Sequence, residues 1–157
     1  MLVCDVFSPD VIRIDLEAHE KEEVFEELVD QYCHARKSRG RERILEAIHE
    51  REMKMSTDVK TGIAIPHGKT DAVRDLGGAL GISHEGIDYG SPDKQPVHLL
   101  FMIIAPLQDS EKHLRLLKRI AEFLEEPTFY RELLEQKSAH DVYNILKKYE
   151  DIFIARD

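Results

Sequence analysis

The sequence has few cysteines, no tryptophan and no long apolar run, and these shortages exclude several classes of protein. Its two cysteines, Cys4 and Cys33, lie far apart and match neither a metal-binding nor a redox spacing, so we expect no disulfide. No apolar stretch approaches the roughly 20 residues that a membrane helix needs. The N-terminal stretch carries Asp5 and Asp10 and lacks the basic start of a signal peptide. We therefore expect a cytoplasmic protein without direct membrane insertion.

Positively charged residues are also fewer than negatively charged ones. Lysine and arginine number 22 against 31 aspartates and glutamates, which gives a formal net charge of −9. Proteins that bind nucleic acid present a basic face, so this balance argues against a nucleic-acid partner. It leaves room for a local basic patch that docks an acidic protein.

The apolar pattern switches between strand and helix periods and predicts one α/β domain over residues 1–157. Strands are expected at 11–16, 63–65, 77–83 and 97–105, and the last is apolar throughout, as in a strand covered on both faces. Helical faces are expected within 24–33, 44–52, 113–124, 129–134 and 138–146, with Ser138 as an N-cap. The apolar stripe expected within 113–124 consists of Leu114, Leu117, Ile120, Ala121 and Leu124. Residues 56–62 are expected to form a loop, and Pro66 to stop the strand before it. The resulting fold is a mixed β-sheet flanked by helices.

The chain has eight histidines, and His67 has the most unusual context. His67 follows the strand that Pro66 ends, and α/β folds place ligand-contacting groups at strand ends. Gly68 has no side chain, so a bulky group can approach the backbone there. Neutral imidazole is a good nucleophile near neutral pH. Taken alone, this context also fits a histidine that is merely hydrogen-bonded at a strand end.

Two further residues are candidates for binding an anion beside His67. His113 lies near a predicted helix start, where unpaired backbone N–H groups favour negative charge. Arg51 ends a helix just ahead of the His67 segment, and its guanidinium can bind a phosphoryl group or a carboxylate in a fork. An ordinary helix-start residue and a surface ion pair are the alternative interpretations.

Other chemistries fit poorly. The sequence has no P-loop, no dinucleotide-binding glycine pattern, no zincin motif and no Gly-x-Ser-x-Gly elbow. A zinc site built from His67, His98 and His113 has no short ligand spacing to support it. We therefore expect neither a metal nor another cofactor.

The residues around His67 resemble the fructose/mannitol-type enzyme IIA domains of the phosphoenolpyruvate-dependent phosphotransferase system, which include the nitrogen-regulatory IIA proteins. The resemblance covers nearly the whole chain, and the run at 62–68 is its most specific part. The matching segments are Glu50-Arg-Glu52, Ser56-Thr57, Gly62-Ile-Ala-Ile-Pro-His-Gly68, Gly86-Ile-Asp-Tyr89, Pro96-Val97, 101–106, His113-Leu-Arg-Leu-Leu117 and Lys137-Ser138-Ala139. The family commonly has a glycine-rich segment where this chain has residues 58–61. That loop is expected to be stiffer here, or shaped for another partner.

The resemblance implies a mixed sheet with helices on both faces, and a phosphotransferase activity. His67 would take a phosphoryl group from the histidine of an HPr-type carrier. His113 would support that group or orient His67, Arg51 would lie near it, and Thr57 would lie close to the same pocket. Apolar neighbours such as Ile63 and Ile65 would keep the site dry.

Two biological roles are compatible with this chemistry. In the first, the chain is a free-standing regulator of the nitrogen branch, whose phosphorylation state controls a target protein. In the second, it is a sugar-transport enzyme IIA that passes the phosphoryl group to a cysteine of a IIB domain. Nitrogen-regulatory members are typically free-standing, and this favours the first.

Overall fold

Strand β6 lies inside a six-stranded sheet and organises the layers around it. The computed structural model describes residues 2–157. Its elements are α1 (Leu2–Val6), the 3₁₀ turn η1 (Pro9–Val11), β1 (Ile12–Arg13), α2 (Lys21–Arg36), α3 (Arg41–Lys54), β2 (Asp58–Lys60), β3 (Ile63–Ala64), β4 (His67–Lys69), β5 (Gly77–Ile87), β6 (Val97–Ala105), α4 (Ser110–Glu125), α5 (Phe129–Glu135) and α6 (Ala139–Arg156). The strand order is β1-β5-β6-β3-β2, and β4 also pairs with β6. Because β5 and β6 are antiparallel while β3 and β4 run parallel to β6, the sheet is mixed, as predicted.

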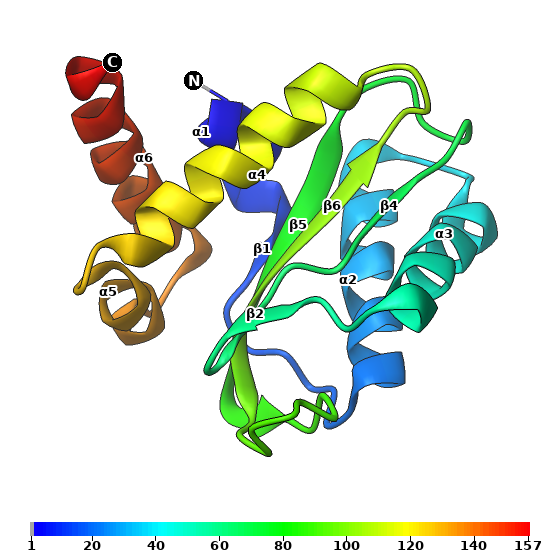
Figure 1. The fold of residues 1–157 in the computed structure, drawn as a ribbon, viewed down its shortest axis with the longest axis horizontal. Coiled ribbons are helices and arrows are strands. Elements are labelled where there is room, and N and C mark those ends of the chain that lie inside the picture. Colours follow the sequence, from blue (N-terminus) through cyan, green and yellow to red (C-terminus); the bar gives the residue numbers. More distant parts are fainter. Residues whose placement is uncertain (1) are drawn as a thin grey trace.

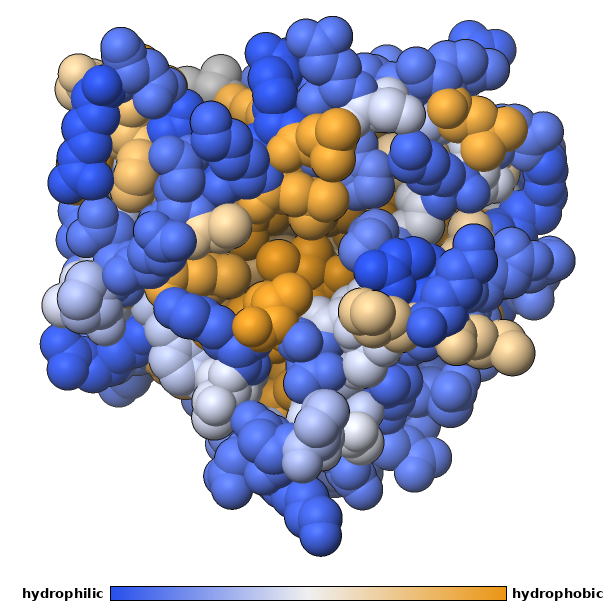
Figure 2. Space-filling model, viewed as in Figure 1, coloured by the Kyte–Doolittle hydropathy of each residue, from blue (hydrophilic) through white to orange (hydrophobic). Residues whose placement is uncertain are grey.

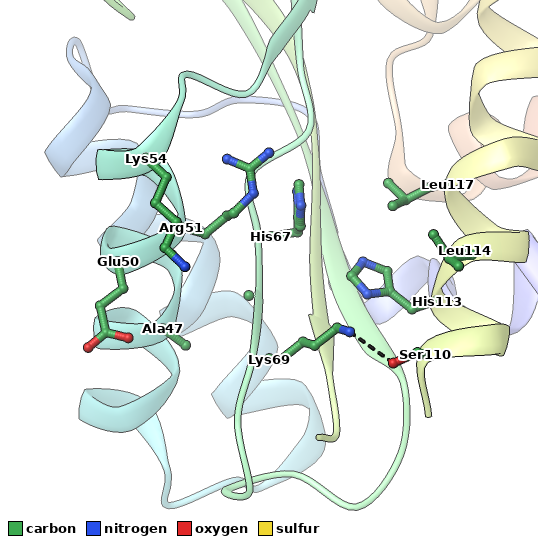
Figure 3. Close-up of a pocket in the computed structure, with 11 residues that line it drawn as sticks. Ala47, Glu50, Arg51, Lys54, His67, Lys69, Ser110, His113, Leu114 and Leu117 are labelled. Atoms are coloured by element: carbon green, nitrogen blue, oxygen red, sulfur yellow. Dashed lines mark hydrogen bonds between the residues drawn. The ribbon is translucent and has the colours of Figure 1, made fainter. Parts of the chain in front are cut away.

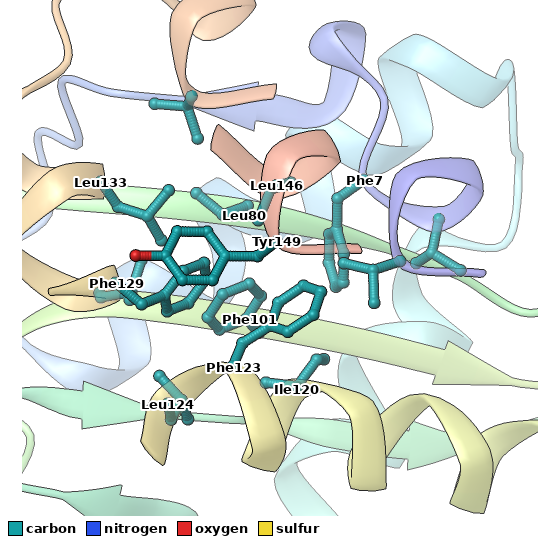
Figure 4. Close-up of a cluster of buried hydrophobic side chains, with 14 of the residues drawn as sticks. Phe7, Leu80, Phe101, Ile120, Phe123, Leu124, Phe129, Leu133, Leu146 and Tyr149 are labelled. Carbon is teal, nitrogen blue, oxygen red and sulfur yellow. The ribbon is translucent and has the colours of Figure 1, made fainter. Parts of the chain in front are cut away.

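Helices cover both faces of the sheet (Figure 1), which confirms the predicted fold class. Side chains of a strand point alternately to opposite faces, and β6 is buried on both. Its residues Leu99, Phe101 and Ile103 join a core with α1, α4, α5 and α6 (Figure 4). Its residues Leu100, Met102 and Ile104 join a second core with α2 and α3. The expectation that residues 97–105 are covered on both sides is therefore confirmed.

The secondary structure differs from the prediction at five places, four of them in strands. The first strand is short, at residues 12–13, and β5 continues to Ile87. Helix α1 at the N-terminus was not predicted. The expected loop at 56–62 contains β2, which pairs with β3, so the segment that lacks glycines forms a strand. Pro66 interrupts the strand without ending the sheet, because β3 and β4 both pair with β6 on either side of it.

The helices match the expected segments, with one error of phase. Ser138 caps α6 through its Oγ, which accepts a hydrogen bond from the Asp141 backbone N–H, as predicted. On α4 the predicted stripe ran through Leu114, but this side chain is 65% exposed. The buried face instead carries His113, Leu116, Ile120, Phe123 and Leu124. Among residues 2–157, no helix combines the length and the apolar character needed to cross a membrane.

Candidate active site

A pocket of about 390 Å³ lies beside β4, between α3 on one side and α4 on the other (Figure 3). It brings together His67, His113 and Arg51, which the sequence analysis singled out separately. Its lining residues are Ala47, Glu50, Arg51, Lys54, His67, Gly68, Lys69, Ser110, His113, Leu114 and Leu117. Since α3 and α4 pack on opposite faces of the sheet, the pocket collects side chains from both faces beside β4.

The backbone around Pro66 sets the orientation of His67. The His67 Nδ1 atom lies 2.8 Å from the carbonyl oxygen of Ile65. A carbonyl oxygen can only accept, so Nδ1 carries the proton and donates it. The neutral ring then has its lone pair on Nε2, which is the nitrogen available for attack on an electrophile.

Burial keeps His67 neutral at physiological pH. The loss of solvent lowers the pKa of His67 below its ordinary value. The hydrogen bond to Ile65 and the charge of Glu52 oppose this effect, while the positive charges of Arg51 and Lys69 add to it. A neutral imidazole near pH 7 is the nucleophilic form.

His113 faces His67 across the pocket, with ring centroids 5.5 Å apart and planes at 72°. It lies in the first turn of α4, as predicted, and is 4% exposed. Burial, with added effects of His67 and Lys69, lowers the pKa of His113 to about 4, so the ring is neutral at pH 7. Its Nε2 atom is buried and has no hydrogen-bond partner within the described residues. Buried polar atoms are normally paired, so this nitrogen has an unused capacity for one hydrogen bond.

Besides Lys54, two cations of the pocket make hydrogen bonds beside the histidines. The guanidinium of Arg51 points towards His67 (Figure 3), while its Nη1 donates to the carbonyl oxygen of Met55 at 2.9 Å. Lys69 reaches across the pocket from β4, and its Nζ donates to Ser110 Oγ at 2.9 Å. The sequence analysis missed Lys69. Strand alternation places residues 67 and 69 on one face, so recognising β4 as a strand would have identified it.

Thr57 and Gly68 lie close to His67 in different ways. Gly68 lines the pocket, and a Cβ atom at this position would lie 2.8 Å from the backbone carbon of Ala47. The missing side chain thus lets α3 approach β4. Thr57 is 3% exposed and does not line the pocket. Its hydroxyl lies behind the pocket, hydrogen-bonded to Glu52.

The apolar lining differs from the expected one. Ile63 and Ile65 were expected to line the site, but both pack into the core. Leu114 and Leu117 of α4 line the pocket in their place. The error follows from the phase of α4, because the sequence stripe assigned these two leucines to the buried face.

The other histidines lie apart from this pocket. His98 bonds to the Ser83 carbonyl oxygen through Nδ1 at 2.7 Å, and His49 lies 3.2 Å from a carboxylate oxygen of Glu22. His19, His34, His84 and His140 are exposed. In the part of the chain that the structure describes, no group of three or more His, Cys, Asp or Glu side chains is arranged to hold a metal ion.

Residues 5–149 match the family described as "Phosphoenolpyruvate-dependent sugar phosphotransferase system, EIIA 2". The chain is 36% identical over 150 residues to the fructose-specific EIIABC component of Bacillus subtilis, covering 96% of this chain and 24% of that protein. It is 39% identical over 126 residues to the fructose-specific EIIA component of Haloferax volcanii, covering 80% and 82%. It is 30% identical over 146 residues to a nitrogen regulatory protein of Bradyrhizobium diazoefficiens, covering 93% and 95%. The chain thus spans about a quarter of the first relative and most of the other two.

Solved structures share the fold. Nitrogen regulatory protein IIA-Ntr of Neisseria meningitidis superposes with a TM-score of 0.84 at 28% identity, covering 93% of this chain and 99% of that one. The complex of enzyme IIAMTL and phosphorylated enzyme IIBMTL of Escherichia coli matches with a TM-score of 0.75 at 21% identity, covering 90% and 99%. The family match, the identities above 30% and the shared fold agree. The chain therefore belongs to the EIIA 2 family of phosphotransfer components in the phosphoenolpyruvate-dependent sugar phosphotransferase system.

Proposed function

We propose that His67 accepts a phosphoryl group from the phosphohistidine of an HPr-type carrier protein. The hydrogen bond from His67 Nδ1 to Ile65 carries this proposal, because it directs the lone pair to Nε2. The Nε2–P bond forms as the bond between phosphorus and the donor nitrogen breaks, and the donor nitrogen keeps that electron pair. His67 retains its Nδ1 proton, and the Ile65 carbonyl stabilises the positive charge that the ring acquires.

The pocket supplies positive charge and donors where the phosphoryl oxygens would lie. Phosphoryl transfer depends mainly on positioning and on stabilising charge on these oxygens. His113 has an unpartnered buried Nε2, and Arg51 and Lys69 are cations in the same pocket. Leu114 and Leu117 keep water from an aligned attack on the phosphohistidine. This role needs no metal ion or other cofactor.

A hydrophobic surface beside the pocket suits a protein donor. Four apolar side chains of α3, α4 and the residues that adjoin these helices are more than half exposed, and we call them the apolar rim: Met53, Met55, Leu107 and Leu114. Figure 2 shows hydrophobic residues gathered on the face that carries α3 and α4. Exposed apolar patches on soluble proteins mark interaction sites. We assign the rim to docking of the carrier and of the acceptor, and we propose that the chain works in the cytoplasm with its phosphoryl donor.

We propose a regulatory role in the nitrogen branch, in which the phosphorylation state of His67 controls a target protein. The likeness to IIA-Ntr of Neisseria meningitidis over 99% of that chain supports it. The alternative is sugar transport, with transfer to a IIB cysteine. The higher identity to the two fructose-specific relatives favours this alternative.

Phosphorylation assays test the shared step and then separate the two roles. Incubation with phosphoenolpyruvate, enzyme I and carrier should label the wild-type chain with an acid-labile phosphoryl group, and His67→Ala should remove the label. Undiminished labelling of this variant would overturn the assignment. Labelled protein is then mixed with fructose- or mannitol-type IIB domains. Retention of the label supports regulation, while efficient transfer to a IIB cysteine supports transport.

A further inference from the structure

A buried carboxylate lies behind the pocket, outside the residues that line it. The Glu52 side chain is 6% exposed and belongs to the last turn of α3. Its oxygens accept hydrogen bonds from the Thr57 backbone N–H at 2.9 Å and from the Thr57 hydroxyl at 2.6 Å. Lys21 Nζ donates at 3.1 Å and the Tyr89 hydroxyl at 3.3 Å. Four donors converge on one carboxylate, which fixes the position of Thr57 relative to α3.

These contacts favour the charged form of the Glu52 carboxylate. Burial acts to raise the pKa of Glu52, but the hydrogen bonds from Thr57 and Lys21 outweigh it and lower the pKa below its ordinary value. The Thr57 hydroxyl gives its one proton to Glu52, so the Tyr89 hydroxyl shares its proton between Glu52 and the Thr57 oxygen, which lies 2.7 Å away. Buried, fully satisfied polar networks rigidify the segments that they join. The segment around Thr57 is thus held in place by two hydrogen bonds to Glu52, one from the Thr57 hydroxyl and one from its backbone N–H.

The backbone continues this connection to His67. The Thr57 carbonyl oxygen accepts a hydrogen bond from the Ile65 N–H at 2.9 Å. The Ile65 carbonyl oxygen in turn accepts from His67 Nδ1 at 2.8 Å. A continuous path of hydrogen bonds therefore runs from Glu52 through Thr57 and Ile65 to the imidazole ring.

We propose that Glu52 and Thr57 are positioning residues, which hold the Ile65 carbonyl so that His67 keeps its proton on Nδ1 and its lone pair on Nε2. The consequence for transfer rests on the proposed function, whereas the tautomer itself does not. Neither side chain touches the phosphoryl group. Partners that orient a functional histidine set its tautomer, and losing such a partner costs activity.

The same network also supports Arg51. The Arg51 guanidinium donates to the carbonyl oxygen of Met55, two residues before Thr57. Anchoring Thr57 therefore fixes both the acceptor of Arg51 and the acceptor of His67. One buried carboxylate thereby aligns the nucleophile with one of its cations.

The imidazole ¹⁵N shifts of His67 in the full, unphosphorylated chain test the proposal. In the wild type we expect a protonated, pyrrole-type Nδ1 and a pyridine-type Nε2. Thr57→Val removes the hydroxyl at nearly constant volume, and we expect both shifts to move towards the average of the two tautomers. The phosphorylation rate should fall roughly tenfold. Thr57→Ser should restore the wild-type shifts and rate, and Glu52→Gln should change the shifts in the same direction as Thr57→Val.

Thr70→Val is the matched control. Thr70 is also buried, but its hydroxyl accepts from the Ala72 N–H and is not on the path to Ile65. We expect this variant to keep the wild-type shifts. A wild-type tautomer in folded Thr57→Val and Glu52→Gln would overturn the positioning role, as would an Nε2-protonated ring in the wild type. If the shifts behave as expected and no label appears, the phosphocarrier function fails while the positioning role stands.

Discussion

His67 and His113 both lose solvent in the fold, which lowers the pKa of each ring, and we propose different tasks for them. The His67 Nδ1 atom is hydrogen-bonded to a carbonyl oxygen, and we propose Nε2 as the nucleophile. The buried Nε2 of His113 bonds to none of the described residues, and we propose it as a donor to a bound phosphoryl group. Two histidines of ordinary basicity at this distance would repel each other below pH 6.5. Burial reduces this repulsion, because it lowers the pKa of both rings and so favours their uncharged forms.

The burial of His113 should make stability depend on pH. The pKa of His113 is about 4 in the folded chain, whereas its ordinary value, which applies to the unfolded chain, is 6.5. Between pH 4 and pH 6.5 the unfolded state therefore binds more protons than the folded state. The free energy of unfolding should therefore fall as pH drops from 6.5 to 4, by roughly 3 kcal/mol from this group. His113→Gln should flatten that part of the profile in denaturant titrations at several pH values.

Exposed His140 on α6 provides the control for this titration. His140→Gln should keep the wild-type slope between pH 6.5 and 4, since its side chain is in solvent. Equal slopes for wild type and His113→Gln would show that His113 is not held neutral by the fold.

At the residue scale, the sequence identified His67, Arg51 and His113 because a specific motif and helix-start chemistry mark them locally. It did not reveal Lys69, whose role depends on β4 placing it opposite Ser110. The sequence indicated that Thr57 lies near the pocket, but not that its side chain bonds to Glu52 and does not line the pocket. That distinction depends on contacts with Glu52 and Tyr89, and Tyr89 is 32 residues away.

At the scale of elements, α4 has two functions. It buries Leu116, Ile120 and Phe123 against the sheet, and its first turn presents His113 to the pocket. The turn begins at Asp109, whose carboxylate accepts a hydrogen bond from the Lys112 N–H at 3.3 Å. This cap fixes the end of the helix that carries the second histidine.

Removing helix caps should separate stability from function. Asp109→Ala and Ser138→Ala each delete one N-cap, and each should lower the free energy of unfolding by about 1 kcal/mol. Only Asp109→Ala should also slow phosphorylation of His67, because α6 carries no pocket residue. Denaturant titration and initial transfer rates measure the two effects. Equal transfer rates in both variants would show that the α4 cap does not position His113.

The sequence located most elements but not the ones that depend on partners far along the chain. The central strand 97–105 is apolar enough to be recognised without its neighbours. Strand β4 has only three residues and exists because Pro66 and its successors pair with residues 103–105 of β6. The phase of α4 was misjudged because Leu114 and Leu117 suit a core as well as they suit the pocket.

At the scale of the whole molecule, the pocket differs from the rest of the surface. The chain carries a net charge of −9, but the pocket gathers Arg51, Lys54 and Lys69 around two histidines, with Glu50 as its one acid. The apolar rim lies beside these cations. This combination suits a partner that brings a phosphoryl group together with a hydrophobic contact surface.

A charged substitution in the apolar rim should weaken binding of the carrier without slowing the phosphoryl-transfer step. Met53 is 87% exposed, so Met53→Glu should leave the fold intact. It should raise the KM for the phosphorylated carrier roughly tenfold and leave kcat unchanged, because a buried charge at an interface weakens docking. Steady-state transfer with varied carrier concentration measures both constants. Ile154→Glu, on the exposed side of α6, is the charge-matched control, and an equal effect there would contradict a role for the rim.

The central claim is that Nε2 of His67 carries the phosphoryl group. It is tested most directly by phosphorylating the full chain with carrier and identifying both the modified residue and the modified nitrogen by mass spectrometry and NMR. The structure predicts a single phosphohistidine at position 67, linked through Nε2. Label on another residue, linkage through Nδ1, or no label from a carrier that phosphorylates another family member under the same conditions would contradict it.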